Sequence, residues 1–345
     1  MSASPWVDHE ELLEENKHYP WFRTKDGTLT DRLFPDDVEL NLDGWLKGCN
    51  DFLSTALPER QAYVLDNETR SAVFYQGSLN EIWAYRGQGK SIAVNALVKI
   101  LVHGGDWLRF RSPGNKKVLL VDGELPKQQL QERLKEFVGQ SDQLQILSPE
   151  LMDNPKHFPA LAIAAQQDFF LKAIEPFKPD VIVFDTLTRC FRFDTNDADA
   201  WLTVNDFLVR LRGLGYCVIL VHHAGKNGTQ RGRTDGDDNL DVSIKLDAPY
   251  GWQAGDGLAF KWIYEKVRHG GNLPDFEAAY DRDTKVWSLT QDERLAEVMA
   301  LTHEGKSSRA IATKLDMTQS MVSRLQRKAR AAGLDKLNEK IGVSQ

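Results

Sequence analysis

The sequence has few cysteines and no long apolar run. Cys49, Cys190 and Cys217 are the three cysteines in 345 residues, and they lack the close spacing of a metal site. We expect them to be reduced and to lie in or near the core. No apolar stretch reaches the roughly 20 residues that cross a bilayer, so a membrane protein is not expected.

The N-terminal residues lack the features of a signal peptide. The segment MSASPWVDHEELLEENKHYPW is acidic, with neither a basic start nor an apolar centre. We therefore expect a cytoplasmic protein.

Acidic residues outnumber basic residues overall, but basic residues are concentrated in one place. The formal net charge is −7, which excludes a uniformly basic nucleic-acid coat. Residues 306–330, in contrast, hold seven basic residues and one acidic residue. This asymmetry indicates a separate basic segment near the C-terminus.

Short β-branched runs alternate with amphipathic stretches from about Val73 onward. This alternation predicts an α/β fold with a parallel central sheet and helices on both faces. Two further runs would extend the sheet or form a hairpin, and three segments are expected to be loops. The strands are expected at 81–84, 117–124, 179–186 and 216–223, the helices at 91–102 and 126–138, the further runs at 257–271 and 275–290, and the loops at 104–117, 148–158 and 225–240.

The stretch AYRGQGKSIA (84–93) ends as a phosphate-binding loop does. Gly89, Lys90 and Ser91 complete the pattern G-x-x-x-x-G-K-[ST], although Ala84 stands where the pattern has its first glycine. The loop lies between an expected strand and helix, where backbone N–H groups and the helix dipole attract an anion. Lys90 would reach the outer phosphates and Ser91 would hold Mg²⁺. The alternative is an ordinary helix start. The nucleotide-binding candidates are Ala84, Tyr85, Arg86, Gly87, Gln88, Gly89, Lys90, Ser91 and Ile92.

Carboxylates lie at the ends of two of the expected strands. Asp185 ends VIVFD and could hold Mg²⁺ together with Ser91. Asp122 and Glu124 end VLLVDGE, and either could orient the attacking water, although the position just past the strand favours Glu124. If each residue is considered alone, Asp185 could instead cap a helix and Glu124 could instead be a solvated loop acid. Their order after a phosphate loop favours an ATPase that uses ATP and Mg²⁺.

These segments resemble a known family. VLLVDGELPKQQLQERL looks like the strand–Glu–Leu/Met–Pro–helix–Arg-Leu segment of RecA-fold replicative helicases of the DnaB type. VIVFDTLTRCFRFD and VILVHHAGKNG are similar to the corresponding strands of RepA-type plasmid replicative helicases. The resemblance covers about residues 75–290 and implies a RecA-like P-loop NTPase. Ala84 departs from the family pattern.

The resemblance also implies sensor and finger residues. His222 or His223, at the end of a strand, would sense the γ-phosphate. Neighbouring histidines on a strand face opposite ways, so a shared metal ion is not expected. Lys266 and Arg268 resemble the Lys-x-Arg pair that DnaB-type rings project into the next subunit's site. Arg231, with Arg233, is the rival finger in the 225–240 loop, and a solvated strand end is the alternative. The implied assembly is a homo-oligomeric ring, with six subunits expected.

Residues 305–333 predict two helices separated by a short break. Thr318 is placed to cap the second helix, and a helix at 291–303 would complete a three-helix unit. The unit resembles a helix-turn-helix of the resolvase and response-regulator kind, which implies duplex DNA in contact with the second helix. The alternative is an amphipathic hairpin that packs on the ATPase core. The implied base contacts are Gln319, Ser320 and Ser323, and the implied phosphate contacts are Arg324, Arg327 and Lys328.

The sequence thus predicts three parts: an N-terminal arm or cap (1–65), a RecA-like ATPase domain (66–290) and an all-α helix-turn-helix unit (291–345). One hypothesis is a DNA helicase or translocase of plasmid or phage replication, with single-stranded DNA gripped in a channel by residues 187–197 or 225–240. The other is an ATP-switched DNA-binding protein, such as a recombination mediator or regulator, without unwinding activity. A small-molecule kinase is disfavoured, because it needs neither a finger strand nor a basic tail.

Overall fold

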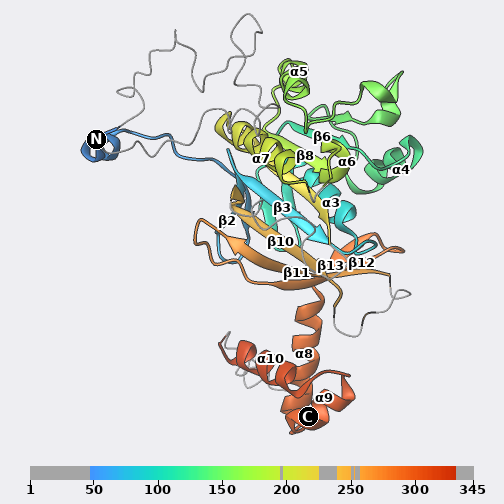
Figure 1. Cartoon of the computed structure of the whole chain (residues 1–345). Coiled ribbons are helices and arrows are strands. Elements are labelled where there is room, and N and C mark those ends of the chain that lie inside the picture. The colour runs from blue at the N-terminus through green and yellow to red at the C-terminus, as the bar shows by residue number, and fades with distance from the viewer. Residues whose placement is uncertain (1–46, 195–196, 225–238, 250–251, 253–256, 332–345) are drawn as a thin grey trace, which may run out of the picture. The chain divides into compact units, whose positions relative to one another are not determined.

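The computed structural model describes residues 47–194, 197–224, 239–249, 252 and 257–331 (Figure 1). The chain divides into two compact units, residues 1–59 and 60–345. The three-part division at 65 and 290 stays a prediction. In the first unit, α2 (Cys49–Ser54) has no buried residue. Cys49 is therefore exposed, whereas Cys190 and Cys217 are buried, so the expectation of a core position is wrong for Cys49.

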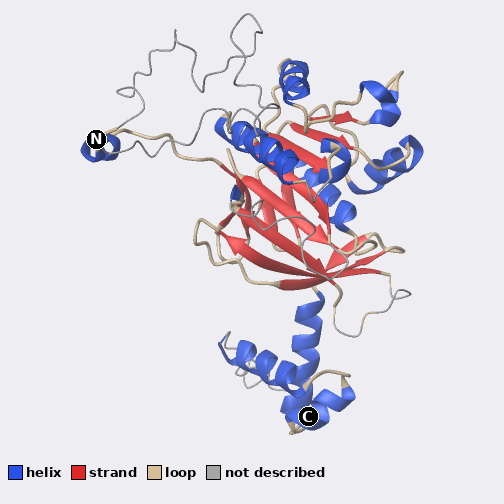
Figure 2. Cartoon of the chain, viewed as in Figure 1, coloured by secondary structure: helices blue, strands red, loops and turns tan. Residues whose placement is uncertain are grey.

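A nine-stranded sheet forms the centre of the second unit (Figure 2). Its order is β13-β12-β11-β10-β3-β9-β8-β6-β7. The strands from β10 to β7 in this order are parallel, and β11, β12 and β13 are antiparallel. This confirms the α/β class with a mostly parallel central sheet. The strands are β3 (Leu79–Ala84), β6 (Val118–Asp122), β7 (Leu144–Leu147), β8 (Val181–Asp185), β9 (Cys217–His223), β10 (Val242–Asp247), β11 (Leu258–Val267), β12 (Phe276–Asp281) and β13 (Val286–Ser288).

Helices cover both faces of the parallel strands, as Figure 1 shows. Strands such as β8, whose five residues are all buried, are apolar throughout because each face packs against helices. One core cluster joins the sheet to α3 and α4, and a second joins it to α5, α6 and α7. The helices are α3 (Lys90–His103), α4 (Lys127–Phe137), α5 (Ala164–Ile174), α6 (Leu187–Phe191) and α7 (Ala198–Gly213), with short 3₁₀ turns η3 (Pro149–Leu151) and η4 (Pro155–His157).

Residues 104–117 are not the loop that the sequence predicts. They contain β4 (Gly105–Trp107) and β5 (Phe110–Ser112), which join β1 (Ala62–Asp66) and β2 (Ala72–Tyr75) in a four-stranded sheet of order β2-β1-β5-β4. The reason is aromatic packing, because Trp107 and Phe110 are buried against Trp262 at ring-centroid distances of 6.1 and 5.1 Å. Two aromatic anchors outweigh the glycine-rich composition of the segment.

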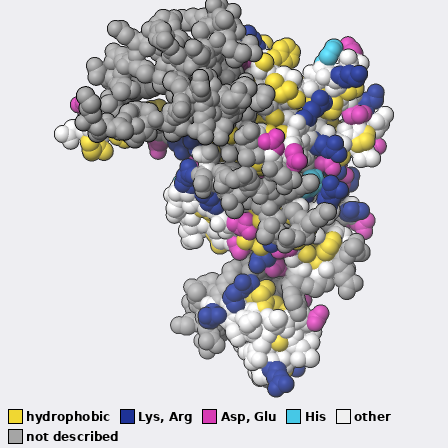
Figure 3. Space-filling view, in the orientation of Figure 1, with side chains coloured by type: hydrophobic (Ala, Val, Ile, Leu, Met, Phe, Trp, Pro, Cys, Tyr) yellow, Lys and Arg dark blue, Asp and Glu magenta, His cyan; other side chains and the backbone are white. Residues whose placement is uncertain are grey.

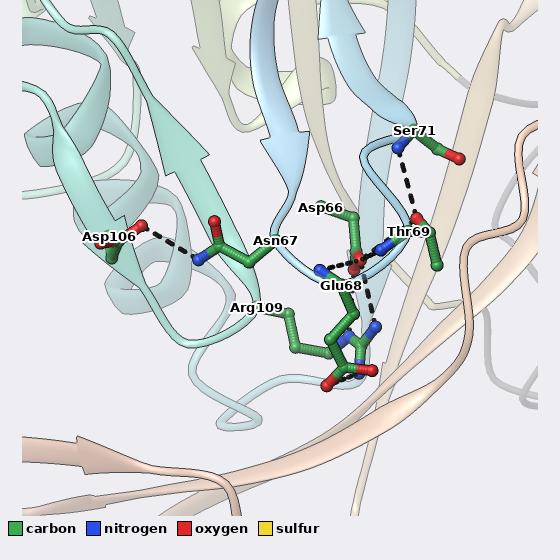
Figure 4. A network of polar contacts seen from close by, with 7 residues as sticks. All are labelled: Asp66, Asn67, Glu68, Thr69, Ser71, Asp106 and Arg109. Carbon is green, nitrogen blue, oxygen red and sulfur yellow. Dashed lines mark hydrogen bonds and ion pairs between the residues drawn. The ribbon is translucent and has the colours of Figure 1, made fainter. Parts of the chain in front are cut away.

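A buried ion pair fastens this small sheet (Figure 4). The Arg109 guanidinium donates to both carboxylate oxygens of Asp66, at 3.0 and 3.1 Å, and contacts Glu68 at 2.7 Å. The backbone N–H groups of Glu68 and Thr69 also donate to Asp66. Because the buried carboxylate has several donors, the β1–β2 turn and β5 are held together by charge-assisted hydrogen bonds.

The segment 275–290 forms two strands rather than one. Between β12 and β13, the Asp281 carboxylate accepts hydrogen bonds from the backbone N–H groups of Asp283 and Thr284. Such a side-chain bond two residues onward favours a tight turn. This turn places Arg282 near the carboxyl end of the parallel strands.

Three C-terminal helices, α8 (Thr290–His303), α9 (Ser308–Lys314) and α10 (Gln319–Ala331), share a separate core cluster. Val298, Ile311, Val322 and Leu325 are buried in it. The backbone N–H of Met321 donates to the Thr318 hydroxyl at 3.2 Å, as a helix cap does. The helices thus occur where the sequence predicts them, and DNA contact stays a prediction. In the described part of the chain, none of the helices has the length and apolar character to span a bilayer.

Candidate active site

A cavity of about 760 Å³ opens where β3 passes into α3, beside the carboxyl ends of the parallel strands. Ligand sites of open α/β sheets form at this edge, because the loops there come together. Seven of the nine nucleotide-binding candidates, Arg86 to Ile92, line the cavity. Glu124, Asp185 and His223 line it as well, so the structure brings together predicted residues from four separate segments.

The two remaining loop candidates lie beside the cavity rather than on its wall. Ala84 is the last residue of β3, fully buried and paired with His223 on β9 and Leu246 on β10. Its φ angle is not among the positive ones. Because the chain is still a strand at this position, a methyl group fits and the missing glycine has a local explanation. Tyr85 is exposed, and its carbonyl faces Lys90.

Gly89 needs to be glycine for two reasons. It precedes α3 with φ of +78°, a conformation that residues with a side chain adopt at a cost. A Cβ atom there would also lie 2.2 Å from Cδ1 of Leu258. The loop therefore runs directly beneath the start of β11.

Lys90 is held inside the loop. Its ammonium group donates to the carbonyls of Ala84 and Tyr85, at 3.1 and 2.9 Å. Burial lowers the pKa of Lys90 to about 8, and the negative charges of Asp185 and Glu124 oppose this change. An incoming triphosphate would replace the two carbonyls as the partner of the ammonium group.

Asp122 and Asp185 lie side by side, as partners at the ends of β6 and β8. Burial raises the pKa of Asp185 to about 6, while a hydrogen bond from the Ser91 hydroxyl opposes the rise. Burial also raises the pKa of Asp122. Two buried carboxylates beside a hydroxyl group suit a divalent cation, whose charge would offset their desolvation. No group of three or more His, Cys, Asp or Glu side chains that could hold a metal ion occurs in the described ranges.

Of the two acids that could orient water, Glu124 has the more accessible carboxylate. Asp122 is 2% exposed, and its carboxylate accepts the backbone N–H groups of Glu124 and Leu125. The Glu124 side chain is 47% exposed and lines the cavity. Asp122 thus shapes the turn that presents Glu124.

His223 contacts Glu124, whereas His222 is buried in the sheet. His223 Nε2 lies 3.4 Å from a Glu124 carboxylate oxygen. Burial lowers the pKa of His223, as does the charge of Lys90, and the Glu124 carboxylate opposes the change. At pH 7 the ring is therefore mostly neutral and can exchange a hydrogen bond with Glu124 or phosphate.

Several cavity residues have no signal in the local sequence. Arg133 comes from α4, Leu258 from β11 and Arg282 from the β12–β13 turn, and Trp252 completes this side. Arg133 belongs to the Arg-Leu pair that follows Glu124, which is the one hint that the sequence contains. The others reach the loop because antiparallel strands continue the sheet beyond β3 and β10.

The finger candidates do not join this cavity. Ser243 on β10 pairs with Lys266, and its neighbour Val242 pairs with Asn80 near the start of β3. The backbone N–H of Arg268 donates to the Asp241 carbonyl just before β10. Both residues therefore lie at the amino ends of the parallel strands, whereas the chain's own phosphate loop lies at their carboxyl ends. Arg231 and Arg233 lie outside the described residues.

The predicted DNA-contact residues lie together on α10. Gln319, Ser320, Arg324 and Arg327 are exposed and Ser323 is half-buried, while the side chain of Lys328 is outside the described part. On the face shown in Figure 3, the C-terminal helices carry several Lys and Arg side chains and fewer acidic ones. The apolar residues of α10 face the three-helix core, which leaves its polar residues outward.

Comparison with known proteins identifies one family. The profile of the AAA domain family matches residues 51–229, which include the phosphate loop, Glu124, Asp185 and His223. No curated protein matches the chain. A solved KaiC-like protein from the hyperthermophilic archaeon Pyrococcus horikoshii OT3 is similar at 12% identity, with a TM-score of 0.47, over 68% of this chain and 99% of that one. The fold assignment rests on the strand order described above.

Proposed function

The chain belongs to the AAA domain family of P-loop ATPases, and from this premise we propose that it hydrolyses ATP with Mg²⁺ as a ring-shaped homo-oligomer. In this proposal it is a DNA helicase or translocase in plasmid or phage replication. The observation that supports ATP hydrolysis is the convergence of Lys90, Asp185 and Glu124 on one cavity at the carboxyl edge of the sheet.

Each residue has a role that its position supports. The amino end of α3 and Lys90 bind the β- and γ-phosphates. Ser91 and Asp185 would hold Mg²⁺, which neutralises charge on the transferring phosphoryl group. Glu124 orients water and takes its proton, while His223 holds the Glu124 carboxylate.

The ring is proposed from the position of Lys266 and Arg268. Both residues lie at the amino ends of the parallel strands, away from the chain's own cavity at the carboxyl ends. In a head-to-tail ring, one surface of each subunit contacts a different surface of the next subunit. A cation from that edge would then complete the neighbour's site, as a finger supplied in trans does.

Single-stranded DNA is proposed to bind beside α6. A cavity of about 560 Å³ is lined by Arg189, Arg192, Phe158 and Phe193. Arg192 lies over the Phe158 ring at 5.2 Å. The two cations suit the phosphates of a strand, and the partly buried Phe193 ring can stack on a base, whereas Phe158 is buried beneath Arg192. Residues 187–194 supply part of this cavity, in line with the sequence hypothesis for 187–197.

Strand displacement tests the motor directly. The chain is incubated with Mg²⁺, ATP and a forked duplex, and unwinding is compared with that of Glu124→Gln. We expect unwinding by the wild type and a loss of hydrolysis on the order of 10²–10⁴-fold in the variant, with ATP binding retained. ATP hydrolysis and DNA binding without strand separation would favour the second candidate, an ATP-switched DNA-binding protein, which the basic three-helix unit supports.

A further inference from the structure

We propose that Arg86 is a catalytic cation supplied in cis, which contacts the γ-phosphoryl group of ATP bound by its own chain. This inference rests on the proposed function and deepens it, because it assigns a further residue to the same site. It differs from a finger in trans, since Arg86 belongs to the phosphate loop itself.

Arg86 lies at the end of the cavity where the acids are. It lines the main cavity together with Lys90 and Glu124. It also lines a smaller adjoining cavity of about 250 Å³, as do Glu124 and His223. These three residues are common to both cavities. Arg86 is thus placed beside the acid that orients water.

The orientation of a bound nucleotide follows from the acids. The γ-phosphorus has to lie near Glu124, because water oriented by this carboxylate attacks it. The nucleoside must then lie at the other end of the cavity, which is lined by Leu258 and Arg282 from the antiparallel strands. Arg86 therefore faces the γ-phosphoryl group rather than the base.

The Arg86 guanidinium is available to a ligand. Its side chain is exposed, and it makes no hydrogen bond or ion pair within the described part of the molecule. Gly87, the next residue, has φ of +83° and open space around it, so the loop is not packed on that side. The charge of Arg133 acts instead on Asp122 and Asp185, where burial raises the carboxyl pKa and the Arg133 charge opposes the rise.

The electrostatics of the site agree with this placement. Burial has the largest effect in lowering the pKa of Lys90 and of His223, and the positive charge of Arg86 lowers both further. Arg86 is therefore near enough to both residues for its charge to act on them. A γ-phosphate bound among them would meet charge from Lys90 on one side and from Arg86 on the other.

The chemical step needs no further reactant. The water oxygen bonds to the γ-phosphorus, the bond from that phosphorus to the β–γ bridging oxygen breaks, and the water proton passes to Glu124. ADP and inorganic phosphate are the products. Negative charge is spread over the γ-phosphoryl oxygens and the bridging oxygen in the transition state, and a fork of N–H donors from Arg86 stabilises it.

Binding of a transition-state mimic tests this role without turnover. Titration calorimetry compares ADP alone with ADP plus aluminium fluoride, both with Mg²⁺, for wild type, Arg86→Ala and Arg86→Lys. We expect Arg86→Ala to bind ADP within about twofold of wild type, and to lose about 30-fold or more in affinity for the fluoride complex. Arg86→Lys should recover part of that loss, because it restores charge without the fork.

The turnover number should fall from wild type to Arg86→Lys to Arg86→Ala. For Arg86→Ala we expect kcat to be reduced on the order of 10²–10³-fold. Arg86 is exposed, so the melting curve of the variant should match that of wild type. Equal affinity of wild type and Arg86→Ala for the fluoride complex would overturn the inference. If wild type itself failed to bind ATP, the proposed function would fall with it.

Mixed assemblies separate cis from trans. Arg86→Ala chains are mixed with Lys90→Ala chains, which have an intact Arg86 but an impaired nucleotide site. We expect no recovery of hydrolysis, because the cation must come from the chain that binds ATP. The matched mixture, Arg268→Ala with Lys90→Ala, should recover activity if Arg268 acts in trans. Recovery in the first mixture would show that Arg86 serves a neighbour and would overturn the cis assignment.

Discussion

At the residue scale, the charge of Lys90 depends on its burial in the loop. Burial lowers its pKa to about 8, close to physiological pH. A triphosphate binds the protonated amine better than the neutral one, so binding raises the pKa and takes up a proton near pH 8. Affinity should be full below pH 8 and should fall as the pH rises towards 9.

Calorimetry of a non-hydrolysable ATP analogue at pH 7, 8 and 9 measures this prediction. Two buffers of different ionisation enthalpy at pH 8 report the proton uptake. Lys90→Met should bind weakly and lose most of the pH dependence over this range. A wild-type affinity that stayed constant from pH 7 to pH 9 would contradict the assigned state of Lys90.

Asp185 leads to a second prediction about a single residue. Its pKa is raised from 3.8 to about 6, chiefly by burial, so the folded state binds a proton more tightly than the unfolded state. The charged carboxylate therefore costs about 3 kcal/mol of folding free energy at pH 7. This cost is full above pH 6 and shrinks as the pH falls towards 4.

Asp185→Asn should thus stabilise the metal-free chain by about 2–3 kcal/mol at pH 7 while abolishing Mg²⁺-dependent hydrolysis. Denaturant unfolding in EDTA measures the first effect. The advantage of the variant should narrow between pH 7 and pH 4, because the wild-type carboxyl becomes protonated there. A variant less stable than wild type at pH 7 would contradict this account.

At the element scale, the loop between β3 and α3 decides which glycines matter. Gly89 combines φ of +78° with a Cβ position 2.2 Å from Leu258. Gly89→Ala should therefore destabilise the chain by about 1–2 kcal/mol and weaken ATP binding. The double variant with Leu258→Ala removes the contact but keeps the backbone strain, so it should recover nucleotide binding only in part.

Ala84→Gly is the matched control for this loop. The change restores the usual phosphate-loop pattern, but Ala84 has strand geometry and its neighbours accept the methyl group. Nucleotide affinity should stay within about twofold of wild type, while stability falls by up to about 1 kcal/mol because glycine weakens a strand. A large gain in affinity would show that the missing glycine limits the site.

The last helix of the C-terminal unit, α10, carries a third element-scale prediction. Arg324 and Arg327 are exposed on α10, whereas Val322 and Leu325 of the same helix are buried. Arg324→Ala with Arg327→Ala should weaken duplex binding and lower the slope of log affinity against log salt by about 2. Fluorescence anisotropy over a salt series measures it, with Arg309→Ala on α9 as a matched control. Unchanged binding would favour the packing role of the hairpin.

At the scale of the whole molecule, the opposite positions of the phosphate loop and of Arg268 predict cooperation between chains. In the proposed ring a neighbour would complete each site, so ATP hydrolysis per subunit should rise with protein concentration. Arg268→Ala should lower kcat by about 10²-fold or more with little effect on ADP affinity. Light scattering alongside the assay relates activity to assembly. Constant activity per subunit from dilute to concentrated solution would rule out a finger in trans.

Local patterns in the sequence predict the α/β class, which the structure confirms, and they also predict a phosphate loop and acids at the ends of β6 and β8, which the structure brings to one cavity. These features are local: β-branched runs form buried strands, and Lys90, Ser91, Asp185 and Glu124 are recognised by their distance from strand ends. The C-terminal helices were predictable for the same reason, since their apolar spacing and the Thr318 cap are short-range signals.

Tertiary structure alone decided the rest. The strands in 104–117 depend on Trp107 and Phe110 meeting aromatic rings more than 140 residues away, which outweighs the local glycines. Leu258 and Arg282 reach the phosphate loop because of the strand order. Arg268 lies at the amino ends of the parallel strands because β11 runs antiparallel to β10. Sheet order is set by packing between distant segments, so no local pattern contains it.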